Sequence, residues 1–303
     1  MKKIAIIANS KYKKAVGLKE RLKNHLPPEY NIFEKLTERQ GHSTALTIEA
    51  VNEGAEIIIA AGGDGTLNEV VNGIMLSPEP LRNKVLLGLY PLGTGNDFAR
   101  TALFKADLET LSKLVVNGKS RKIDLGCVEF SDGKNEKVIR YFDNIADIGI
   151  GARTVEIVNK STKPLGSTLT FILSVLKAFT GYKQQKVRVK TADFEWIGKI
   201  VAVCMANGKY FGSGLGISPG ASLDNGKLSL VIVGNISVVH FLRYLPALRK
   251  LKFINHPEVH YRQMNWCEIT ADEKYPLEMD GESVGFTPLK ATVIPQALNL
   301  LTS

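Results

Sequence analysis

The chain has 303 residues, of which 44% are hydrophobic and 23% charged, so it is long enough for two domains of about 150 residues and too apolar for wholesale disorder. Its formal net charge of +9 favours a nucleic acid, an anionic lipid or an acidic metabolite as partner. The basic residues are scattered and no nucleic-acid-binding motif accompanies them, so we expect no nucleic acid. Three widely spaced cysteines without a C-x-x-C pair argue against a disulfide framework or a zinc site. With neither a signal peptide nor an apolar run of about 20 residues, we expect a cytoplasmic protein.

The first part of the chain alternates strand-like and helix-like patterns. Apolar runs predict strands at 4–8, 31–36, 57–61, 85–90 and 122–128, and helical spacing predicts helices at 15–25, 43–52, 67–74 and 108–116. Alternating β and α elements are typical of a parallel sheet covered by helices.

Residues 56–73, EIIIAAGGDGTLNEVVNG, read as a buried strand, a glycine turn and a helix. Backbone N–H groups exposed by the glycines at a helix N-terminus favour an anion such as a phosphate. The motif is neither a P-loop nor a dinucleotide fingerprint. It adds Asp64 inside the turn, where a carboxylate could hold Mg²⁺ or accept a proton. The alternative is a tight turn in which Asp64 is only the N-cap.

Strand patterns dominate the second part, at 138–145, 186–191, 195–206, 227–233, 259–270, 275–279 and 289–294. Hairpin-like turns at 224–226 and 280–281 join several of them. We therefore predict an antiparallel sheet or sandwich, interrupted by helical insertions at about 167–180 and 237–251.

Four acidic residues stand out. Asp64, Asp97 and Asp124 each lie at the end of a predicted strand of the first part, and in a parallel sheet such ends share one edge. Taken singly, Asp97 is an N-cap and Asp124 a salt-bridge partner. Glu282 is by default a solvated charge in a hairpin turn.

Five blocks together carry a resemblance: AGGDGTLNEVVNG (61–73), PLGTGNDFA (91–99), RKIDLG (121–126), LDNGKL (223–228) and MDGE (279–282). In this order and spacing they resemble the bacterial diacylglycerol kinase and lipid kinase family, which is related to the sphingosine kinases. GGDGT also occurs in NAD kinases and phosphofructokinases, whereas LNEVVNG and the late Asp-Gly-Glu have the lipid-kinase form. The resemblance implies a three-layer α/β nucleotide-binding domain (1–125, with 295–303 returning to it) and an antiparallel β-sandwich domain for the lipid (126–294).

The resemblance also implies roles for particular residues. The ATP phosphates would be bound by Gly62, Gly63, Asp64, Gly65, Thr66, Leu67 and Asn68, and Thr37, Thr94 and Asn9 would also contact the nucleotide. Asn9 matches the family pattern, but the segment after it departs, because Ser10-Lys11 stands where many relatives have proline and a following glycine. Asp64, Asp97 and Asp124 would form an acidic network that works through the catalytic Mg²⁺, with Glu282 as general base. A second, structural Mg²⁺ would be bound by Ser222 and Lys227 carbonyls and by Asn225, which replaces the family's aspartate, or by the adjacent Asp224.

The function implied is phosphorylation of the hydroxyl of diacylglycerol or a similar lipid, with ATP and Mg²⁺ as cofactors. Apolar helices flanked by lysine and arginine, at 171–179 and 241–252, suit transient docking at the inner face of a membrane, although core packing is the alternative. The rival functions are an NAD kinase acting on a soluble nucleotide and a lipid-binding or regulatory protein without turnover. The sequence leaves open a homodimer, the acceptor and the nucleotide preference.

Overall fold

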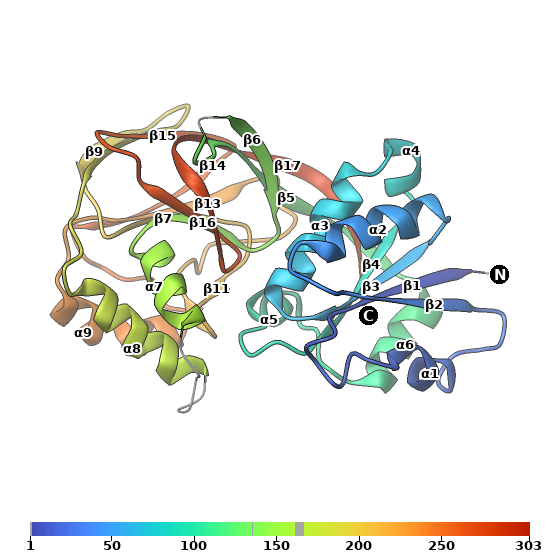
Figure 1. The fold of residues 1–303 in the computed structure, drawn as a ribbon. Helices are drawn as coiled ribbons and strands as arrows, with labels where there is room; N and C mark the ends of the chain where they lie inside the picture. Colours follow the sequence, from blue (N-terminus) through green and yellow to red (C-terminus); the bar gives the residue numbers. More distant parts are fainter. Residues whose placement is uncertain (1, 135, 161–166) are drawn as a thin grey trace. The chain divides into compact units, whose positions relative to one another are not determined.

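The computed structural model describes residues 2–134, 136–160 and 167–303. The chain forms two compact units (Figure 1). The first comprises Met1–Ile123 and Gln296–Ser303, and the second comprises Asp124–Pro295.

The first unit is built on a parallel sheet of five strands in the order β17-β4-β3-β1-β2. The strands are β1 (Lys3–Ala8), β2 (Asn31–Leu36), β3 (Ile57–Gly62), β4 (Leu86–Pro91) and the end of β17 (Glu282–Leu301). Every residue of β3 is buried, as expected for an apolar strand covered on both faces. Because the strands are parallel, the turns that follow β1, β2, β3 and β4 lie at one edge of the sheet.

Six helices accompany this sheet: α1 (Leu18–Lys23), α2 (His42–Asn52), α3 (Asp64–Leu76), α4 (Glu79–Arg82), α5 (Asp97–Ala102) and α6 (Leu108–Asn117). Helices α2 and α3 lie side by side on one face, and α1 and α6 lie on the other (Figure 1). Gly73 lets α2 and α3 approach closely, since a Cβ there would lie 2.7 Å from the carbonyl oxygen of Thr44. The buried Glu69 accepts hydrogen bonds from the backbone N–H groups of Gly41 (2.7 Å) and Ser43 (2.9 Å). A side chain of α3 therefore caps the N-terminus of α2.

The second unit is β-rich. Its strands are β5 (Ser120–Ser131, which enters from the first unit), β6 (Lys137–Phe142), β7 (Ile145–Gly149), β8 (Lys186–Lys190), β9 (Glu195–Lys199), β10 (Ala202–Ala206), β11 (Tyr210–Phe211), β12 (Leu215–Gly216), β13 (Leu228–Val233), β14 (Val259–Met264), β15 (Trp266–Ala271), β16 (Pro276–Met279) and most of β17. The run β14-β13-β10-β7-β16-β17 is antiparallel, and β17 continues into pairing with β15, which pairs in turn with β8. Helices α7 (Ile150–Asn159), α8 (Ser167–Phe179) and α9 (Val238–Arg249) complete the unit.

Period-two alternation gives the strands of this unit two apolar faces. On β7, Ala146 and Ile148 point into a core shared by the strands, whereas Ile145 points into a second core that includes residues of α7, α8 and α9. On β10, Met205 and Cys204 divide in the same way. A residue's position along β7 thus decides whether it faces strands or helices.

Several predicted elements of the second part differ from those observed. The runs 138–145, 195–206 and 259–270 were each predicted as one strand, and each is two strands, separated at 143–144, 200–201 and 265. Helix α7 was not predicted. The turn at 224–226 precedes β13, whose partners are β10 and β14, so it does not join a hairpin. Asp280-Gly281 does join the antiparallel strands β16 and β17, with both residues at positive φ.

Candidate functional site

Two glycine turns meet at the carboxyl edge of the parallel sheet. The backbone N–H groups of Leu92 and Gly93 both donate to the Gly62 carbonyl, at 2.7 and 3.3 Å. A Cβ on Gly93 would lie 2.5 Å from the Cα of Gly63, so only glycine allows this approach. The turn after β3 and the turn after β4 therefore form one backbone-lined cradle, which suits phosphate oxygens.

Asp64 is the first residue of α3, and Gly63 is the N-cap, so the interpretation of Asp64 as N-cap is wrong. The backbone N–H of Phe98 donates to Asp64 Oδ1 at 3.4 Å, which places this carboxylate at the start of α5. Asp97 is likewise the first residue of its helix, with Asn96 as N-cap, and it is buried. The structure thus brings Asp64 and the Asp97 backbone together in the first unit.

Burial raises the pKa of Asp64, and backbone N–H groups of Phe98, Asp97 and Asn96 oppose that rise. A carboxylate whose burial disfavours the charge is stabilised by a nearby cation. Asp64 beside a phosphate cradle therefore fits Mg²⁺ carried by a nucleotide.

The remaining predicted phosphate residues cluster at the same edge. Asn9 Nδ2 donates to Thr66 Oγ1 at 2.9 Å, and the Ser10 hydroxyl donates to the Thr37 carbonyl at 2.6 Å. Leu67 and Asn68 are buried in the first turns of α3, and Thr94 is exposed in the turn after β4. Sequence reasoning missed Tyr12, whose hydroxyl would lie 3.0 Å from a Cβ on Gly63. Its pKa is raised by burial and by the charge of Asp64. Tyr12 thus lies over the glycine turn.

Asp124 and Glu282 belong to the second unit. Asp124 is fully buried, and its Oδ2 accepts a hydrogen bond from the backbone N–H of Gly226 at 2.6 Å. Asp124 is therefore bound to the 222–227 turn, the predicted structural metal site.

Hydrogen bonds close that turn. Asn225 Oδ1 accepts from the Lys227 N–H at 3.1 Å, and the Ser222 hydroxyl donates to Asp224 Oδ1 at 2.8 Å. Among the described residues, no three His, Cys, Asp or Glu side chains are grouped so as to hold a metal ion. The second Mg²⁺ stays a prediction, and both of its proposed side-chain ligands, Asn225 and Asp224, accept a hydrogen bond within the turn.

Glu282 opens β17 and lies 3.3 Å from Arg140, measured from Oε2 to Nη2. The preceding turn residue, Asp280, is buried and accepts hydrogen bonds from the backbone N–H groups of Ile145 (2.8 Å) and Asp143 (3.1 Å). These contacts fix the hairpin, and hence Glu282, against the start of β7.

Asp280→Ala is expected to lower the free energy of unfolding by about 2–5 kcal/mol, because two buried N–H groups lose their acceptor. Asp280→Asn keeps one acceptor oxygen and should cost less than half as much. Urea denaturation followed by far-UV circular dichroism measures both variants. Equal stabilities for the Ala variant and the unmodified protein would show that the hairpin is fixed by other contacts.

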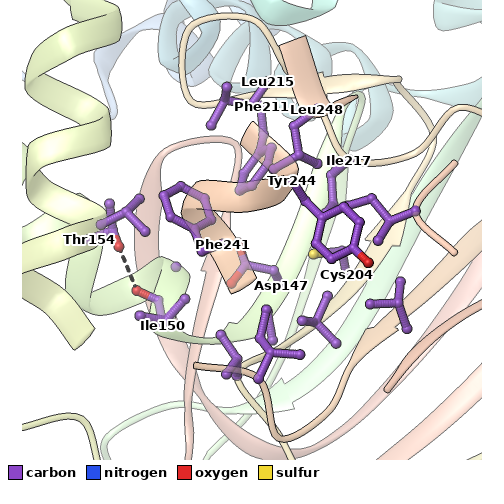
Figure 2. A pocket seen from close by; sticks show the side chains of 18 of the residues that line it. Asp147, Ile150, Thr154, Cys204, Phe211, Leu215, Ile217, Phe241, Tyr244 and Leu248 are labelled. Atoms are coloured by element: carbon purple, nitrogen blue, oxygen red, sulfur yellow. Dashed lines mark hydrogen bonds between the residues drawn. The ribbon is translucent and has the colours of Figure 1, made fainter. Parts of the chain in front are cut away.

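The second unit also contains an apolar pocket of about 850 Å³, open mouth included. It is enclosed by the helix-facing side of β7, β10 and β13 and by residues of α7, α8 and α9, among them Ile150, Val175, Phe241 and Leu248 (Figure 2). Its lining is apolar apart from a few groups, of which Asp147 is the one carboxyl among the lining residues that the structure describes. Such a lining suits an acyl chain.

The comparisons with known proteins agree with both units. Residues 3–128 match the diacylglycerol kinase catalytic domain, and residues 144–302 match the YegS C-terminal NAD kinase beta sandwich-like domain. The chain is 31% identical over 296 residues to a "probable lipid kinase YegS-like" of Yersinia enterocolitica, covering 97% of this chain and 94% of that protein. The chain belongs to the YegS and diacylglycerol kinase family of lipid kinases.

One further relative and one solved structure resemble the chain. The chain is 31% identical to the diacylglycerol kinase of Bacillus subtilis over 250 residues, covering 82% of this chain and 78% of that protein. A crystal structure of a diacylglycerol kinase from Bacillus anthracis superposes with a TM-score of 0.70 at 18% identity, covering 100% of this chain and 97% of that one. The predicted family is confirmed, as is the fold class of an α/β domain followed by an antiparallel β-sandwich domain.

Proposed function

We propose that this lipid kinase transfers the γ-phosphate of ATP, with Mg²⁺, to the hydroxyl of diacylglycerol or a similar lipid. The glycine cradle alone does not distinguish this reaction from that of other kinases in the wider superfamily, because it would contact only the phosphates of the nucleotide. The apolar pocket of the second unit is the observation that supports a lipid acceptor, since a polar dinucleotide would make no apolar contacts with its lining.

We assign each group of site residues a separate role in the reaction. In this proposal the Gly62–Thr66 turn holds phosphate oxygens through backbone N–H groups, Gly93 holds the turn after β4 against it, and Asp64 holds the cation. When bound, Mg²⁺ neutralises charge on the phosphates. Glu282 accepts the proton of the lipid hydroxyl, whose own pKa is far above 7. Asp97 and Asp124 complete the acidic network proposed for this site.

The lipid must be taken from a membrane, and the helices beside the pocket supply a surface for this. Leu169 and Leu173 of α8 and Val239 and Leu242 of α9 are exposed, and Phe179 contacts Phe241 between the two helices with ring centroids 6.1 Å apart. Basic residues of the same segments border them: Lys177, Arg243, Arg249, Lys250 and Lys252. Exposed leucine and valine beside cations favour an anionic bilayer. Among the described residues no helix is long and apolar enough to cross one.

Leu173→Glu is expected to weaken binding to vesicles of 30% anionic lipid by about tenfold, because it places a like charge at the bilayer surface. Co-sedimentation measures the bound fraction, and Leu76→Glu, at an exposed leucine of α3 in the first unit, is the matched control. An equal loss of vesicle binding in the Leu173→Glu and Leu76→Glu variants would argue against docking through α8.

The decisive experiment incubates the protein with Mg²⁺ and γ-labelled ATP and offers diacylglycerol, monoacylglycerol and sphingosine in mixed micelles, with NAD in a parallel tube. Label in an organic-extractable product is expected. Label in NADP instead would overturn the lipid acceptor, and label in neither would favour a lipid-binding protein without turnover.

A further inference from the structure

The wall of the apolar pocket holds a carboxyl group that the proposed mechanism does not use. Asp147 lies on β7, directly opposite Glu278 of β16 in the antiparallel pair. The neighbours Ala146, Ile148, Leu277 and Met279 all point into the core between the strands. By alternation, Asp147 and Glu278 therefore point to the helix-covered face, where the pocket lies.

Asp147 is only 1% exposed, yet no N–H or hydroxyl donor of the described residues reaches either of its oxygens. The hydrogen within reach is the proton of Glu278, whose side chain can hydrogen-bond to Asp147. The Gly281 N–H donates to Glu278 Oε1, so Glu278 has a backbone partner as well. Asp147 is thus left as an acceptor with unused capacity in an apolar cavity (Figure 2).

The fold makes room for this carboxyl. Gly151 in the first turn of α7 packs directly against it, because a Cβ there would lie 2.1 Å from Asp147 Oδ1. Cys204 of β10 is its apolar neighbour on the same face. A buried carboxylate whose one donor within reach is a neighbouring carboxyl costs stability, so its presence in the wall of an apolar pocket indicates that a ligand supplies further donors.

We infer that the lipid bound in this pocket carries an amine near its head, as a long-chain amino alcohol does, and that Asp147 accepts its N–H. This deepens the proposed function and rests on it for the reaction. A glycerol diester offers only ester oxygens beyond the hydroxyl that reacts, and these are acceptors that repel a carboxylate. An ammonium supplies both the missing donors and the compensating charge.

The ionisation of the pair fits this assignment. Burial raises the pKa of Asp147 to about 6, and burial together with the charge of Asp147 raises the pKa of Glu278 well above its usual value. Of the two carboxyls, Asp147 therefore carries the negative charge above a pH of about 6, and Glu278 is the one that favours its proton. Other titratable groups near the pair or in the pocket lining are Cys204, Tyr182, Tyr275, Asp280, His240, Tyr244 and His256.

The test measures binding by the full chain without nucleotide, using dodecylamine, dodecanol and dioctanoylglycerol below their micelle concentrations in isothermal titration calorimetry. At pH 7.5 the amine is expected to bind about 10–100-fold more tightly than the alcohol. Asp147→Asn should reduce that ratio to about twofold and leave the alcohol unchanged. Asp193→Asn, at an exposed aspartate between β8 and β9, should keep the full ratio.

A pH series on the unmodified protein tests the same group without any variant. The preference for amine should fall as pH drops through about 6, because Asp147 becomes protonated while the amine stays charged. The Asp147→Asn protein should show a flatter series. An unchanged pH dependence in that variant would assign the effect to a group other than Asp147 and overturn the inference.

Failure of the inference and failure of the proposed function give different results. Tight diester binding that is insensitive to Asp147→Asn, with diacylglycerol phosphorylated, would overturn the amine assignment alone. Absence of binding for all three probes would remove the pocket as lipid site, and with it both proposals.

Discussion

Glu282→Gln is expected to lower kcat by about 10²–10⁴-fold, the range found for loss of a general base. The amide is isosteric and its oxygen can still accept from Arg140, so the hairpin contact is kept. The amide cannot accept the hydroxyl proton. KM for ATP should change little, because the proposed phosphate contacts are made by backbone N–H groups of Gly62–Thr66 and not by Glu282. Steady-state kinetics in mixed micelles gives both constants.

Glu129→Gln is the matched control, since Glu129 of β5 is in an exposed ion pair with Lys137 and lies outside the proposed machinery. It should retain full turnover. A kcat for Glu282→Gln within threefold of the unmodified enzyme would exclude Glu282 as base while leaving family membership intact.

Gly93→Ala is expected to reduce ATP affinity at least tenfold and to lower the free energy of unfolding by about 1–3 kcal/mol. The added methyl group would lie 2.5 Å from the Cα of Gly63 and 2.7 Å from Asn96 Oδ1, so the two glycine turns must separate. The clash is with backbone, which cannot rotate away as a side chain could. Equilibrium binding of ATP and urea denaturation measure the two effects separately.

Gly133→Ala controls for the glycine change itself, because among the residues that the structure describes a Cβ at Gly133 meets only Phe286, at 4.0 Å. It should alter neither quantity measurably. If Gly93→Ala bound ATP normally despite reduced stability, the turn after β4 would not be part of the phosphate site.

The elements of the first unit were predictable because their signals are local. Strand β2 has the predicted bounds, and β3 differs by one residue, since apolar runs between glycine or proline positions mark them. The turn at Asp280-Gly281 was also predictable, because the Asp-Gly pair is itself a local signal for a hairpin turn. Contacts between residues distant in sequence could not be predicted. Glu69 of α3 caps the N-terminus of α2, and no residue near position 42 indicates this contact.

The second unit was harder because its strands follow one another with little punctuation. Asp143-Asn144 separates β6 from β7 without glycine or proline, so the apolar pattern alone reads as continuous. Helix α7 begins at Ile150 directly after β7, where strand-forming residues prevail. Asp147 was missed for a related reason. A lone acid in the run Ile145–Ile150 was the available signal, and only the register shows that this acid is paired with a second buried carboxyl, Glu278.

Strand β17 belongs to both units: its first residues pair with β16, and Asn299 and Leu300 pair with β4. Together with β5, it makes the chain pass between the units twice. The first unit is therefore not formed by one continuous segment of the sequence. A recombination that exchanged residues 1–123 alone would bring in a new β4 but keep the old end of β17. The edge of β4 would stay unpaired unless the two strands matched in register. Relatives of this enzyme should accordingly have diversified by substitution within a shared frame, rather than by trading halves.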